Sequence, residues 1–102
     1  MSVKVIALVT INEDQPVALA QYLAATGPLL DAAGGKILQR FVVQDVVVGK
    51  KPAQSVMIVE YPDRAAVDAV FGSQIYKDII PIRDTAFSTY DVSVAAMEQA
   101  VA

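Results

Sequence analysis

Four side chains carry most of the chemistry that this sequence offers: Arg83, Tyr76, Tyr22 and Glu60. The chain has no cysteine and no histidine, which excludes thiol nucleophiles, imidazole acid–base catalysis and Cys/His metal sites. Any catalysis would have to use tyrosine, arginine, lysine, serine or carboxylate groups. No glycine-rich phosphate-binding motif is present, and we expect neither a metal nor another cofactor.

Arg83 carries a permanent charge on a predicted helical face that it shares with Ile79 and Ile80. Such a guanidinium needs a carboxylate or carbonyl partner. It could hold the acid group of a ligand through two parallel hydrogen bonds. Alternatively, it forms an internal ion pair, for which Glu60 and Asp14 are the candidate partners.

Tyr22 and Tyr76 each lie on the inward stripe of a predicted helix, and their hydroxyls could face a pocket between helices and sheet. Buried tyrosines also commonly pack in a core with a satisfied hydroxyl. Glu60 alternates with apolar strand neighbours and therefore points to the face opposite theirs. There it either pairs with a base such as Arg40 or acts as a proton acceptor.

The composition favours a single domain, residues 1–102, that associates with a second copy of itself. Hydrophobic residues make up 55% of the chain and charged residues only 19%, an excess that a small domain can bury against a partner. The net charge is −3 without a cluster of basic residues, which argues against nucleic acid as a partner. The apolar N-terminal run is too short to span a membrane, so we interpret it as a strand of a cytoplasmic protein.

Hydrophobic periodicity predicts four strands and two interrupted helices. The expected strands are Val3–Ile11, Lys36–Val48, Ser55–Tyr61 and Phe87–Ala96, which is followed by a short tail, Met97–Ala102. A bulge or bend at Gln44-Asp45 should divide Lys36–Val48 into two strand halves. A turn at 49–52 should join the second and third strands as a hairpin with a loop of more than two residues.

The first helix is expected after Asn12 and Asp14, which are candidate N-caps, and should end at Gly34-Gly35. Gly27-Pro28 should kink or restart it. Asp63 is the expected N-cap of the second helix.

Gly72-Ser73 should interrupt the second helix, and a further kink is expected near Pro81. Beyond the interruption, Tyr76 and Arg83 should share one face, because they are seven residues apart.

The order strand, helix, strand, strand, helix, strand predicts an α+β fold of the ferredoxin-like kind. Its four-stranded antiparallel sheet would carry both helices on one face. Val3–Ile11 and Val56–Val59 are apolar on both sides, so the other face needs cover. The simplest cover is a second copy of the chain, giving a homodimer through the sheet faces.

The sequence also resembles the family known as Domain of Unknown Function 1330, within the dimeric α/β-barrel superfamily. The resemblance rests on Tyr22, on Gly34-Gly35 followed by Lys36 and a strand, on VMIVEYP, and on SQIYKDIIPIR with its serine, tyrosine, proline and arginine at the family's spacing. It implies a ferredoxin-like fold, a homodimer formed through the sheets, and no established reaction. Phe71 stands where the family usually has tryptophan, and Gln44–Val48 lacks the usual glycine-rich bend, so the pocket can differ in shape.

Two classes of function remain open. In the first, each subunit binds or transforms a small anionic organic molecule between helices and sheet, with Arg83 as the anchor and Tyr22 and Tyr76 along the approach. In the second, the chain is a non-catalytic homodimeric module.

Overall fold

The central strand of the fold is β1 (Val3–Ile11), the almost wholly apolar segment near the N-terminus. The structure is a computed structural model that describes residues 2–96. Its other strands are β2 (Lys36–Val42), β3 (Ser55–Tyr61) and β4 (Phe87–Ala95). Its helices are α1 (Pro16–Ala32), α2 (Arg64–Phe71), α3 (Gln74–Asp78) and α4 (Ile80–Ala86).

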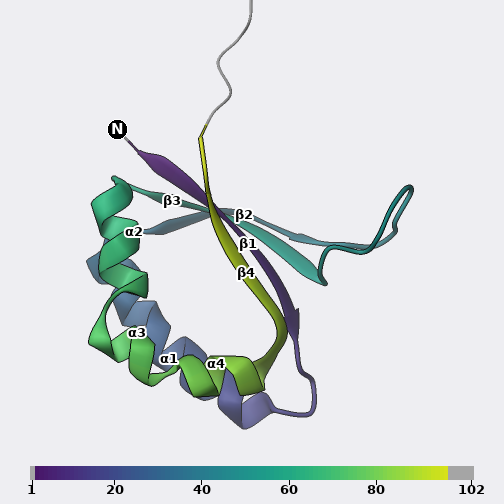
Figure 1. The fold of residues 1–102 in the computed structure, drawn as a ribbon, viewed down its shortest axis with the longest axis horizontal. Helices are drawn as coiled ribbons and strands as arrows, with labels where there is room; N and C mark the ends of the chain where they lie inside the picture. The colour runs from purple at the N-terminus through teal and green to yellow at the C-terminus, as the bar shows by residue number, and fades with distance from the viewer. Residues whose placement is uncertain (1, 97–102) are drawn as a thin grey trace, which may run out of the picture.

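The four strands form one antiparallel sheet in the order β2-β3-β1-β4. All four helices lie on the same side of this sheet, while the loop between β2 and β3 extends away from them (Figure 1). The predicted ferredoxin-like α+β fold is therefore confirmed, as is the hairpin with a long loop.

The two faces of the sheet differ in what covers them. On β1, Val5, Ala7 and Val9 are buried toward the helices. The alternate residues point to the opposite side, where the register pairs Ile6 with Ile58. We call this side the outer face and define it by its apolar residues: Ile6, Leu8, Phe41, Val56 and Ile58.

Helix ends follow the predicted capping only in part. Asp63 caps α2 as expected, accepting a hydrogen bond of 2.8 Å from the Ala66 amide. Asp14 does not cap α1, whose N-cap is Gln15 without a side-chain bond. The Asn12 side chain instead accepts a hydrogen bond of 3.3 Å from the Asp14 amide, which forms a local turn before the helix.

Proline acts differently in the two helical regions. The predicted break near Pro81 is confirmed, because α3 ends at Asp78 and α4 starts at Ile80 with the proline in its first turn. At Gly27-Pro28, by contrast, α1 continues as one 17-residue helix and does not restart. Leu29 packs against both buried clusters of the core, and this packing holds the helix together despite the hydrogen bond lost at Pro28.

The strand predicted as Lys36–Val48 is too long. β2 ends at Val42, and its register shift lies between Ile37 and Gln39 rather than at Gln44-Asp45. Beyond Val42 the chain leaves the core, and the exposed fractions of Val47 and Val48 are 92% and 91%. A β-rich sequence does not form a strand without a neighbour to pack against.

Two glycines with opposite surroundings give a test of the helical layer. A Cβ at Gly27 would meet nothing within 4 Å, whereas one at Gly72 would lie 2.7 Å from the Asp68 carbonyl oxygen. We expect Gly27→Ala to raise the free energy of unfolding by about 0.5–1 kcal/mol through helix propensity. Gly72→Ala should lower it by about 1–3 kcal/mol, because the backbone must shift. Urea unfolding of both variants checks the pair, and equal signs would contradict this description of α1 and α2.

Candidate ligand-binding cavity

A cavity of about 240 Å³ lies between the helices and the sheet. All four tyrosines of the chain line it: Tyr22, Tyr61, Tyr76 and Tyr90. Most of the remaining wall is apolar, with Thr26 and Arg40 as its other polar side chains. A smaller hollow of about 170 Å³ shares part of this wall. The fold thus forms a partly open, largely apolar space with a few polar groups, as small-molecule sites do.

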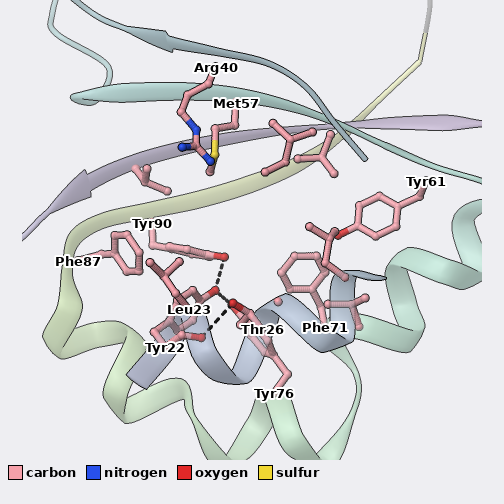
Figure 2. A pocket seen from close by; sticks show the side chains of 16 residues that line it. Tyr22, Leu23, Thr26, Arg40, Met57, Tyr61, Phe71, Tyr76, Phe87 and Tyr90 are labelled. Carbon is pink, nitrogen blue, oxygen red and sulfur yellow. Dashed lines mark hydrogen bonds between the residues drawn. The ribbon is translucent and has the colours of Figure 1, made fainter. Parts of the chain in front are cut away.

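Three of the tyrosines join their hydroxyls at one side of the cavity, next to α1 (Figure 2). The Tyr22 hydroxyl lies 3.1 Å from that of Tyr76 and is also hydrogen-bonded to that of Tyr90. The rings meet edge to face, with centroids 6.3 Å apart for Tyr22 and Tyr76 and 5.7 Å for Tyr22 and Tyr90. These residues come from α1, α3 and β4, so the network connects both helical regions with the sheet.

The hydroxyls of Tyr22, Tyr61 and Tyr90 are held in their neutral form. Burial is the largest cause that raises the pKa of Tyr22 well above its ordinary value, with the neighbouring Tyr90 and Tyr76 adding to it. Burial likewise raises the pKa of Tyr90 and of Tyr61. All three therefore present O–H groups, not phenolates, near neutral pH.

Arg83 reaches this network from outside the cavity wall. Its Nη1 donates to the Tyr76 hydroxyl at 3.3 Å, and its Nε and Nη2 donate to Asp84 Oδ1 at 3.2 and 3.1 Å. Its guanidinium carbon lies 5.3 Å from the ring centroid of Tyr90 and 5.8 Å from that of Tyr76. Burial acts to lower the pKa of Arg83, but the bonds to Tyr76 and Asp84 outweigh it and raise the pKa.

The predicted ionic partners of Arg83 and Glu60 are wrong. Arg83 pairs with its chain neighbour Asp84, not with Glu60 or Asp14. Glu60 lies on the outward side of the sheet, as its alternation predicted, and pairs with Lys4 at 3.8 Å rather than with Arg40. These two residues are directly opposite each other on adjacent strands, which favours this pair over a more distant one.

The structure thus brings together three of the four candidate site residues. Tyr22 and Tyr76 form part of the cavity wall, Arg83 contacts Tyr76, and Glu60 lies apart from them. Sequence reasoning missed Tyr90. The signal was available, because Tyr90 occupies every second position with Val92 and Val94 and so shares one face of β4 with them. In register it is paired with the inward-facing Val9.

Over residues 2–96, no three acidic side chains gather closely enough to hold a metal ion. In the same part of the chain, no helix combines the length and apolar character needed to cross a membrane.

The sheet order, the helices on one face and the aromatic cavity define a small ferredoxin-like protein. Its chain belongs to the family described as "Domain of unknown function (DUF1330)", whose model matches residues 4–97. The comparison with curated proteins found no match.

Solved structures share the fold at low sequence identity. RPA0582 of Rhodopseudomonas palustris, a protein of unknown function, has a TM-score of 0.79 and 20% identity, with 97% of this chain and 84% of that chain covered. SnoaB of Streptomyces nogalater, a cofactor-independent oxygenase, has a TM-score of 0.62 and 13% identity over 98% and 96% of the two chains. A dimeric ferredoxin-like protein of unknown function from Thermobifida fusca has a TM-score of 0.55 and 14% identity over 95% and 92%. At these identities the likeness is one of fold.

Proposed function

We propose that the protein binds a small anionic organic molecule in the tyrosine-lined cavity, and that it does so as a homodimer in the cytoplasm. The observation that carries the proposal is the cavity itself, in whose wall all four tyrosines of the chain gather. Tyr22 and Tyr76 offer hydroxyls there, and Arg83 holds the hydroxyl of Tyr76.

The cavity restricts the size and character of such a ligand. Its volume of about 240 Å³ lies below the roughly 300–1,000 Å³ typical of drug-sized sites. Apolar and aromatic side chains make up most of the wall, so the body of the ligand should be apolar and compact. The tyrosine hydroxyls and an arginine supply polarity at separate points, which suits an organic acid carrying a single ring.

The outer face supports the homodimer and, with it, the second candidate function, a non-catalytic dimeric module. Ile6, Ile58, Leu8 and Val56 form a continuous apolar strip across the two central strands. No helix covers this side of the sheet within residues 2–96 (Figure 1). A second copy packed sheet to sheet would bury it. The Thermobifida fusca protein, which shares the fold, is dimeric.

A calorimetric screen of small aromatic and aliphatic carboxylic acids tests the ligand proposal. We expect saturable binding of at least one acid, with a matching rise in thermal stability, because a ligand that binds only the folded state stabilises it. The chain has no tryptophan, so its intrinsic fluorescence comes from tyrosines that all line the cavity, and binding should change it. If no acid bound and the fluorescence stayed constant, the ligand proposal would be wrong and the dimeric module would remain.

A further inference from the structure

Arg40 is the only charged side chain among the described residues that line the cavity. It lies on β2, opposite Met57 of β3 in the sheet register. Met57 packs against both buried clusters on the helix side of the sheet. Arg40 therefore points toward the helices, and Figure 2 shows its guanidinium beside Met57, on the sheet side of the cavity.

Within residues 2–96, Arg40 has no carboxylate partner. The three ion pairs in this part of the chain are made by Lys4, Arg64 and Arg83. The guanidinium of Arg40 is always charged and carries five donors in a planar fork that fits a carboxylate. Arg40 is exposed, as is the rest of β2, so this permanent cation lies at the open side of the apolar cavity with its donors available to a ligand.

The tyrosine network leaves one hydroxyl proton available at the other side. Tyr22, Tyr76 and Tyr90 have three O–H groups, and the two hydrogen bonds of the Tyr22 hydroxyl use two of their protons. Arg83 donates to the Tyr76 oxygen, which favours a chain in which Tyr76 donates to Tyr22 and Tyr22 donates to Tyr90. The remaining proton then belongs to Tyr90, whose side chain lines the cavity.

We propose that Arg40, not Arg83, binds the carboxylate of the ligand, and that Tyr90 donates a hydrogen bond to an acceptor oxygen at the ligand's other end. This inference rests on the proposed function and specifies its ligand: a compact acid with an apolar body and a carbonyl or ether oxygen remote from the carboxylate. Arg83 is a positioning residue, because it contacts Tyr76 and is absent from the cavity wall.

An inward-pointing charge on an edge strand also discourages edge-to-edge association of sheets. β2 is such an edge strand. If Arg40 served only that purpose, its removal would promote aggregation without changing which ligands the cavity prefers. The preference for an acid over its neutral amide therefore separates the two roles.

The test uses 4-acetylbenzoate, which carries a carboxylate and a ketone oxygen at opposite ends of one ring, and its neutral analogue 4-acetylbenzamide. Dissociation constants are measured by two-dimensional ¹H–¹⁵N NMR titration of the full chain. The wild type should bind the acid at least about tenfold more tightly than the amide, since only the acid can make a charge-assisted bidentate contact with Arg40. Arg40→Gln should remove this preference, and Arg40→Lys should keep part of it.

Two further variants complete the design. Arg83→Gln should retain the preference for the acid, even if both affinities fall, because it acts through Tyr76. Tyr90→Phe should weaken the binding of 4-acetylbenzoate by about three- to tenfold and leave the binding of benzoate unchanged, since benzoate has no acceptor at that end. Thermal unfolding of each variant establishes that it folds.

The outcomes separate this inference from the proposed function. The role of Arg40 is overturned if Arg40→Gln leaves binding unchanged. It is also overturned if Arg83→Gln loses the preference for the acid while Arg40→Gln keeps it. In both cases the cavity remains a ligand site. If neither the two probes nor any acid of the calorimetric screen bound the wild type, the proposed function would fall together with this inference.

Discussion

Ile58→Glu is expected to abolish the proposed homodimer. Ile58 lies at the centre of the outer face, paired in register with Ile6 of β1 on one side and Gln39 of β2 on the other. In a dimer packed sheet to sheet, the new carboxylate would be buried without a partner, at a cost of several kcal/mol. The monomer that results would expose an apolar sheet, so we expect it to aggregate or to unfold at a lower temperature.

Size-exclusion chromatography with light scattering measures this directly. The wild type should have a mass near twice 10.9 kDa, and Ile58→Glu should lose that species. Ala69→Glu is the matched control, because Ala69 is an exposed residue of α2, on the helical side of the sheet. It should remain dimeric. A clean wild-type monomer at micromolar concentration would refute the dimer.

The fold could be predicted because its signals are local. The alternation of Val5, Ala7 and Val9 with outward neighbours, and the cap at Asp63, each depend on a few adjacent residues. Two points that differ from prediction, a restart of the first helix at Pro28 and the length of the second strand, lie where packing decides. α1 continues through Pro28 because Leu29 anchors it in the core, and the strand does not reach Val47 and Val48 because nothing covers them.

The site could be predicted only in part, and a single irregularity in β2 explains one of the failures. Strict alternation from Lys36, which is opposite Glu60, would put Arg40 on the same face as that glutamate. The register shift between Ile37 and Gln39 instead turns Arg40 toward the helices and into the cavity wall. A bulge re-aims every following side chain, and the sequence gives no clear sign of this one.

The partner of Arg83 could not be predicted for a different reason. Asp84 is its neighbour in the chain, and adjacent residues on a helix do not normally face each other. Here the guanidinium lies against the rings of Tyr76 and Tyr90, which brings two of its nitrogens within reach of Asp84. This arrangement depends on β4 and α3 meeting at one point, a tertiary contact that no local pattern encodes.

Removing the side chain of Tyr22 should have the largest effect on the stability of a single subunit. Its exposed fraction is 4%, and its ring meets those of Tyr76, Phe87 and Tyr90 edge to face. Tyr22→Ala should lower the free energy of unfolding by about 3–5 kcal/mol, as large aromatic deletions in a core do. Tyr22→Phe keeps the ring and removes the central hydroxyl. It should lower the free energy of unfolding by only about 1–2 kcal/mol, because Tyr76 and Tyr90 each lose a hydrogen-bond partner.

The same residue should make the protein sensitive to alkali. Burial raises the pKa of Tyr22 in the folded state above its ordinary value, which is about 10 in an unfolded chain. Above that pH the unfolded chain releases the phenolic proton while the folded chain keeps it, so the unfolded state binds fewer protons and stability falls as pH rises. We expect the free energy of unfolding to be constant with respect to this group below about pH 9 and to decline above pH 10.

Tyr22→Phe should make that decline shallower, since it removes one of the groups whose pKa is raised. Urea unfolding across the alkaline range, followed together with the ultraviolet absorbance of phenolate, measures both effects. A native protein in which Tyr22, Tyr61 and Tyr90 all ionised near pH 10 without loss of structure would contradict the burial of these hydroxyls.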